Sequence, residues 1–135
     1  MKKNKLLIVL VLGLMAFSSC TETDPVDPDV DPRDKFLGTW NVQENIDGQV
    51  SGAYQSEITN DQGNTSRIRI GNIYNLGAAT GVNALVAGNS LDINSQSVTG
   101  VTIVGTGLFA NSGFTLNYTA NDGAQSNIVQ AIYTR

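Results

Sequence analysis

Few residues in this chain of 135 could support catalysis. It has no histidine and only one cysteine, which excludes Ser-His-Asp or Cys-His nucleophile pairs and the usual zinc and copper sites. Acid–base chemistry would depend on carboxylates, and residues 36–135 contain six acids: Glu44, Asp47, Glu57, Asp61, Asp92 and Asp122. Four of them, all aspartates, lie in or beside expected turns. We therefore predict that the protein is not an enzyme and uses no cofactor.

The balance of charge narrows the possible partners. Eight lysines and arginines stand against twelve acidic residues, and the net charge of −4 has the wrong sign for binding nucleic acid. After residue 35, the only bases before Arg135 are Arg67 and Arg69, two positions apart on one face of an expected strand. They could contact an anion. Two arginines make no extended patch, so we interpret them as a solvated outer face that discourages edge pairing.

One carboxylate falls at a position where an interior side chain is expected. Glu44 shares its strand face with Trp40, Val42 and Ile46. If that face points into a barrel, the carboxylate would anchor a ligand, pair with an arginine or sit near the open mouth. The simpler interpretation, which we favour, is that Glu44 is exposed at the end of its strand. We name Glu44 and Tyr54 as candidate ligand-binding residues, although Trp40 and Tyr54 also fit plain core positions.

Strands must position these side chains. Residues 36–135 contain no proline, and apolar residues alternate with polar ones, which is typical of half-buried antiparallel strands. The alternating segments are 40–46, 54–58, 67–70, 91–93, 114–118 and 128–133. Between them lie turns such as Gly88-Asn89, which predicts a tight hairpin, and residues 73–82 have room for one short helical turn. The sequence predicts an all-β fold, a small antiparallel up-and-down β-barrel of about eight strands with a largely filled interior.

The N-terminus has the pattern of an export signal. Lysines within residues 1–5 precede the apolar run 6–17. A helix of that length spans about 18 Å, short of the ~30 Å hydrocarbon core, so we assign residues 1–19 to a signal peptide rather than a membrane span. The sequence Phe17-Ser18-Ser19-Cys20 resembles the lipobox of bacterial lipoproteins. That resemblance implies that Cys20 carries acyl chains such as palmitate, becomes the new N-terminus and anchors the protein in a membrane.

An acidic spacer follows the cysteine. Residues 20–35 contain all three prolines, each after an aspartate, and six acids against two bases. Proline favours extended backbone and like charges repel, so we expect a disordered, solvated tether. Asp27, Asp29 and Asp31 alternate as in a calcium-binding loop, but Pro32 stands where glycine is required, so we expect no metal. Acids just after a lipidated cysteine also resemble the surface-export signal of Bacteroidetes lipoproteins, which implies an outer-membrane lipoprotein that faces the cell surface.

The remaining chain resembles lipocalins and other calycins at its first and last strands. The segment Phe36-Leu37-Gly38-Thr39-Trp40 matches their Gly-x-Trp element. The resemblance implies that Trp40 closes one end of the barrel and that Arg135 packs across it through a cation–π contact. Over most of the domain the chain is similar to small Bacteroidetes-type lipoproteins, in the pieces Gly38-Thr39-Trp40, Gly88-Asn89, residues 98–109 and Tyr133-Thr134-Arg135.

These observations divide the chain into a signal peptide (1–19), a lipidated tether (20–35) and a lipocalin-like β-barrel domain (36–135). The function we expect is that of a membrane-anchored cell-envelope module that binds an apolar or glycan-like small ligand at one mouth of the barrel. The alternative is a structural or protein-interaction subunit of a cell-envelope assembly, with a filled barrel and no small ligand. The expected partners are thus the membrane and either a small ligand or an envelope protein.

Overall fold

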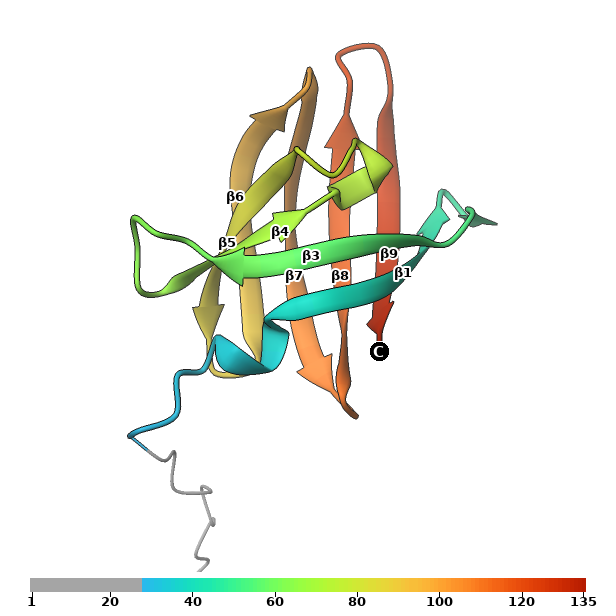
Figure 1. Cartoon of the computed structure of the whole chain (residues 1–135). Coiled ribbons are helices and arrows are strands. Elements are labelled where there is room, and N and C mark those ends of the chain that lie inside the picture. The colour runs from blue at the N-terminus through green and yellow to red at the C-terminus, as the bar shows by residue number, and fades with distance from the viewer. Residues whose placement is uncertain (1–27) are drawn as a thin grey trace, which may run out of the picture.

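The computed structural model describes residues 28–135, which form a closed β-barrel (Figure 1). The sheet has nine strands in the order β2-β1-β3-β4-β5-β6-β7-β8-β9, and β1 also pairs with β9. All pairings are antiparallel. Because β2 is a two-residue strand on the end of β1, the other eight strands close the barrel. The all-β, up-and-down prediction is confirmed, and the architecture is compatible with a lipocalin-like fold.

The strands follow one another along the chain. They are β1 (Gly38–Ile46), β2 (Gln49–Val50), β3 (Tyr54–Asn60), β4 (Arg67–Gly71), β5 (Gly81–Ala87), β6 (Ser90–Val98), β7 (Val101–Ala110), β8 (Gly113–Asn121) and β9 (Ser126–Thr134). Two 3-10 helices accompany them, η1 (Asp34–Phe36) and η2 (Ile73–Asn75). The second is the short helical turn expected within residues 73–82, and the two-residue loop between β5 and β6 is the expected Gly88-Asn89 hairpin.

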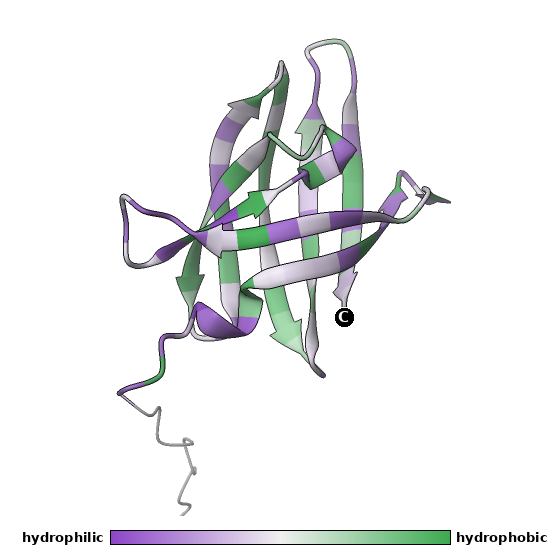
Figure 2. Ribbon diagram, viewed as in Figure 1, coloured by the Kyte–Doolittle hydropathy of each residue, from purple (hydrophilic) through white to green (hydrophobic). Residues whose placement is uncertain are grey.

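The core forms because alternate side chains of each strand turn inward. Figure 2 shows the resulting alternation of apolar and polar positions along the strands. Each of the eight barrel strands contributes buried apolar residues, and Phe36 of η1 joins them. The largest fully buried apolar side chains are Trp40, Tyr133, Phe36, Ile58, Ile68, Ile70, Ile73, Leu91, Ile93, Ile103 and Leu116. Side chains from the whole circumference therefore occupy the interior.

Two inward-facing glycines of β7 allow this close packing. A Cβ on Gly105 would lie 2.6 Å from the Cα of Tyr118, and one on Gly107 would lie 3.3 Å from the Cβ of Leu91 and in collision with the Leu116 side chain. Real Cβ atoms do not come so near to backbone. Glycine at both positions thus makes room for the bulky residues of β8 that point into the barrel.

The two ends of the barrel differ. One end, at the bottom of Figure 1, holds η1, the β7–β8 turn and the C-terminal residue; we call it the closed end. The opposite end holds residues 72–80, which connect β4 to β5 and include η2; we call these residues the lid segment, and this end the lid end. Each end has its own cluster of polar and aromatic side chains.

The folded part begins a few residues before Phe36. Arg33 forms an ion pair with Asp31 and donates hydrogen bonds to the carbonyl oxygens of Asn64 and Arg67. The last residues of the expected tether therefore pack against the barrel. The signal peptide, Cys20 and Asp27 lie outside the described residues. Within residues 28–135, no helix has the length and apolar character needed to cross a bilayer.

Candidate functional site

The closed end is sealed around Trp40. Its indole is 1% exposed, and its Nε1 donates a 2.7 Å hydrogen bond to the carbonyl oxygen of Phe36. The Phe114 ring meets it edge-on, with centroids 5.0 Å apart. The guanidinium carbon of Arg135 lies 4.0 Å from the centre of the indole ring, and its Nη2 donates to the carbonyl oxygen of Leu37 at 2.5 Å. The structure thus brings together Trp40 and Arg135, the two residues named for barrel closure.

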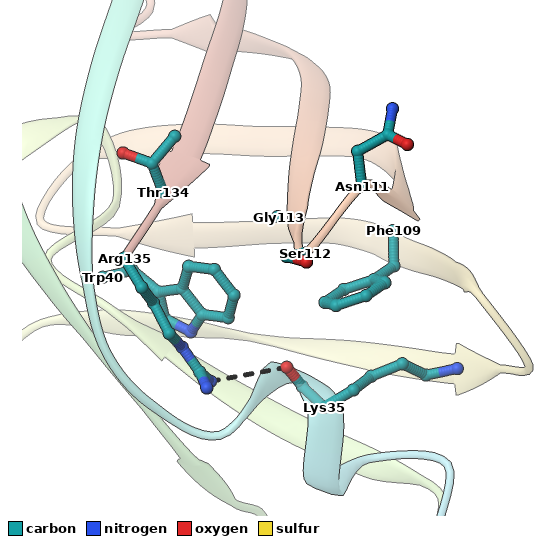
Figure 3. Close-up of a pocket in the computed structure, with 8 residues that line it drawn as sticks. All are labelled: Lys35, Trp40, Phe109, Asn111, Ser112, Gly113, Thr134 and Arg135. Carbon is teal, nitrogen blue, oxygen red and sulfur yellow. Dashed lines mark hydrogen bonds between the residues drawn. The ribbon is translucent and has the colours of Figure 1, made fainter.

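A hollow of about 560 Å³ opens beside this seal (Figure 3). The lining residues are Lys35, Trp40, Phe109, Asn111, Ser112, Gly113, Thr134 and Arg135. Lys35 donates from Nζ to the Asn89 side-chain oxygen, and Arg135 also reaches the Lys35 carbonyl oxygen at 3.4 Å. Both cations therefore donate to neutral oxygens, and the hollow lies beside the seal.

The lid end holds a buried carboxylate. Glu44 is 2% exposed and points inward with Trp40 and Val42, so our interpretation that it is exposed at a strand end is wrong. The hydroxyls of Tyr54, from β3, and Tyr118, from β8, each donate a 2.5 Å hydrogen bond to Glu44 Oε1. The two candidate ligand-binding residues, Glu44 and Tyr54, are in direct contact.

Tyrosine hydroxyls replace the water that Glu44 loses on burial. A carboxylate moved into an apolar core without donors carries a large desolvation penalty, and two hydroxyl donors recover part of that penalty. The other expected partner of an inward Glu44, an arginine, is not there. Arg67 pairs with Asp61 at 2.8 Å, and Arg69 donates from the outer face of β4 to the carbonyl oxygen of Ala79.

The neighbouring phenols are held in their neutral form. Burial raises the pKa of Tyr118 well above its ordinary value, and the charge of Glu44 raises it further. Burial, reinforced by Tyr133 and Glu44, raises the pKa of Tyr54 in the same direction. The pKa of Tyr133 is also raised, first by its complete burial and then by Glu44. No lysine or arginine contributes to these shifts among the described residues, so Glu44 is the charge that dominates the lid end.

Two further polar groups are buried near the cluster. Tyr133 is 0% exposed, and its hydroxyl lies beside that of Ser56, which donates to the carbonyl oxygen of Gly71 at 2.7 Å. The side-chain oxygen of Asn127 is buried and has no hydrogen-bond partner within residues 28–135. Buried oxygens without such a partner are uncommon in folded proteins.

The lid segment closes over this cluster in a strained conformation. Asn72, Tyr74 and Asn75 have φ values of 52°, 55° and 53°, in the left-handed region. Asparagine tolerates this region, whereas for tyrosine it costs on the order of 1–2 kcal/mol. The Tyr74 hydroxyl accepts a 2.7 Å hydrogen bond from Asn127 Nδ2, and its ring meets that of Tyr118 edge-on at 6.4 Å. These contacts hold the lid segment on the barrel.

The remaining candidates serve other roles in the structure. Arg67 and Arg69 alternate with inward Ile68 and Ile70 and lie on the outer side of β4, as interpreted. They do not protect a free edge, because β4 pairs with both β3 and β5. Asp31 binds Arg33 rather than standing free. Within the part of the chain that the structure describes, no three potential metal-ligating side chains come together.

The sequence reasoning missed Tyr118, Tyr133 and Tyr74 as members of the site. A signal was present for the first two, because Phe114, Leu116 and Tyr118 alternate on one face of β8, and Val129, Ala131 and Tyr133 do so on β9. Nothing in the sequence connected these faces to Glu44, since Tyr118 lies 74 positions further along the chain. No protein-family model matches this chain, and a search of curated proteins finds no significant match.

Proposed function

We propose that the protein is a binding module of the cell envelope that takes an apolar or glycan-like small ligand at the lid end of its barrel. In this proposal Cys20 carries the lipid that anchors it as an outer-membrane lipoprotein, and the tether lets the barrel face the cell surface. The observation that carries the binding role is Glu44, a buried carboxylate that pairs with no cation of residues 28–135 and is contacted by tyrosine hydroxyls beneath the lid segment.

A buried polar cluster of this kind does not favour folding by itself. An apolar residue of similar size at position 44 would avoid the desolvation of a carboxylate, so stability alone gives no reason for this choice. Aromatic rings and hydroxyls around one charged group are, in contrast, what a small-ligand site uses for apolar contact and orientation. The side chains that fill the barrel axis confine such a ligand to the mouth, where movement of the lid segment would admit it.

Native mass spectrometry of the full chain tests this proposal. The protein would be extracted in mild detergent from cells that produce it. We expect a fraction with the added mass of one small molecule, and we expect Glu44→Gln to lose that mass. Glu57→Gln is the matched control, because Glu57 is an exposed carboxylate on β3, and this variant should retain the ligand. A single unliganded mass for the wild-type protein would contradict the proposal.

The second candidate function, a protein-interaction subunit, is favoured by the outer face of β7, β8 and β9. Residues 93–134 contain one charged residue, Asp122, which lies in a turn. Val104 and Leu108 of β7 and Ile128 and Ile132 of β9 are exposed there by 42%, 57%, 72% and 46%. Affinity capture from intact cells tests this function: a partner held by the wild-type chain should be lost in Ile128→Glu, and the absence of any such partner would contradict it.

A further inference from the structure

The charge at the lid end is not balanced by the protein. The groups that face Glu44 come from β3, β8 and β9 and are Tyr54, Tyr118 and Tyr133, which are all neutral. Arg67 and Arg69 of β4 are bound to Asp61 and to the Ala79 carbonyl on the outside of the barrel. Arg33 pairs with Asp31, and Arg135 lies at the closed end. A ligand that brought a positive charge to Glu44 would therefore supply what residues 28–135 lack.

Hydrogen-bond acceptors also outnumber donors here. Both tyrosine hydrogen bonds go to Oε1 of Glu44, which leaves Oε2 for a further donor. Asn127, whose side-chain oxygen has no hydrogen-bond partner among the described residues, contacts Tyr74 at the same end of the barrel. A primary ammonium has three N–H donors and no acceptor, which suits the unused oxygen of a carboxylate.

Aromatic rings supply the third element. The rings of Tyr74 and Tyr118 lie edge-to-face at the lid end, and Tyr54 reaches Glu44 from the neighbouring strand. The negative faces of such rings attract a cation, and their apolar bodies cover the carbon atoms that it carries. Carboxylate, unpaired acceptors and rings thus point to the same kind of ligand.

We propose that the lid end binds a small organic ammonium ion, a primary amine on an apolar or sugar-like body, with Glu44 as its counter-ion. This inference rests on the proposed function and specifies its ligand class. The amine would approach Oε2 of Glu44 when the lid segment moves. The lid is held by the side chain of Asn72, which donates to the Gln55 carbonyl oxygen and accepts from the Gly77 amide, and by the bond between Asn127 and Tyr74.

Calorimetric titration of the full chain with two matched probes tests the inference. The probes are 2-phenylethylamine, which is cationic at neutral pH, and 2-phenylethanol, which has the same ring and chain but no charge. We expect the wild-type protein to bind the amine at least about tenfold more tightly than the alcohol, as one charge-assisted contact implies. We expect Glu44→Gln to abolish that preference and Glu57→Gln to keep it.

The outcomes separate this inference from the proposed function. Equal affinity for the two probes, or binding of neither, overturns the ammonium ligand, whereas the native mass measurement reports on any small ligand whatever its charge. If Glu44→Gln does not fold, as judged by circular dichroism, Tyr133→Phe replaces it. This variant removes one buried acceptor and should weaken amine binding by a larger factor than alcohol binding; an unchanged ratio would overturn the inference.

Discussion

The packing of β7 against β8 predicts that Gly105→Ala will destabilise the barrel strongly. The new Cβ would lie 2.6 Å from Tyr118 Cα and nearer still to its Cβ and to the Asn117 carbonyl oxygen. Backbone atoms cannot rotate away as a flexible side chain would. Over-packed substitutions cost about 1–3 kcal/mol, and this one belongs at the upper end because the nine residue pairs of β7 and β8 must separate to relieve it.

Urea denaturation at neutral pH measures the effect. The intrinsic fluorescence of Trp40, the only tryptophan, reports on the closed end, and circular dichroism reports on the whole sheet. With a loss of about 3 kcal/mol, the midpoint of thermal unfolding should fall by roughly 15 °C in a domain of this size. The matched control is Gly52→Ala, since a Cβ on Gly52 meets nothing within 4 Å. This control should leave stability unchanged or raise it by about 0.4–1 kcal/mol.

The comparison also tests how Tyr118 is positioned. If Gly105→Ala unfolds at the same urea concentration as Gly52→Ala, then β7 and β8 tolerate a side chain between them, and the account of the inward glycines is wrong. If Gly105→Ala is destabilised as expected, the shift of β8 should also move Tyr118 relative to Glu44. In that case the variant should bind the amine probe less tightly than Gly52→Ala does.

Three further predictions concern the closed end, the tyrosines and the anchor. Arg135→Ala should lower the free energy of unfolding by about 1–2 kcal/mol in urea denaturation, because it removes the cation–π contact with Trp40 and the hydrogen bond to the Leu37 carbonyl oxygen. Neutral surface substitutions usually change stability by no more than about 0.5 kcal/mol, so a loss within that range would contradict this reasoning. The raised pKa values of Tyr54, Tyr118 and Tyr133 mean that their protonated forms stabilise the fold fully below pH ~10 and progressively less above it. The tyrosinate absorbance of these three residues should therefore appear together with unfolding rather than before it, and Tyr74→Phe removes the signal of the fourth tyrosine from the measurement. Cys20→Ala should release the protein from the membrane fraction, and a variant that stays with the outer membrane would disprove the lipid anchor.

The barrel could be predicted because the sequence patterns that specify its strands and turns each extend over only a few neighbouring residues. Alternation along each strand and the glycine and asparagine turns act over a few residues, so Gly88-Asn89 and the turn near Ile73 were found from the sequence alone. Trp40 is buried within the same alternation, and the Gly-x-Trp resemblance suggested its contact with Arg135. The number of strands was right for the closed barrel, and only β2, with two residues, was too short to be anticipated.

The lid end could not be predicted because its contacts join distant segments. The alternation that buries Trp40 and Val42 also buries Glu44, but the general cost of burying a charge argued for exposure. In the structure, the buried carboxylate accepts hydrogen bonds from the hydroxyls of Tyr54 on β3 and Tyr118 on β8, and Tyr118 lies 74 positions from Glu44 in the sequence. The left-handed conformation of Tyr74 was equally hidden, since tyrosine has no preference for it.

The contrast between the two ends explains why binding is assigned to one of them. At the closed end, Nε1 of Trp40 and Nη2 of Arg135 are bonded to backbone carbonyl oxygens that the fold holds in place, and the cations there lie at the surface. At the lid end, no cation of residues 28–135 pairs with Glu44, and the side-chain oxygen of Asn127 has no hydrogen-bond partner in that range. The left-handed Tyr74 contacts both Asn127 and Tyr118 there. An end that is complete stabilises the barrel, whereas an end with unmet charge and hydrogen bonds gains free energy when a complementary ligand arrives.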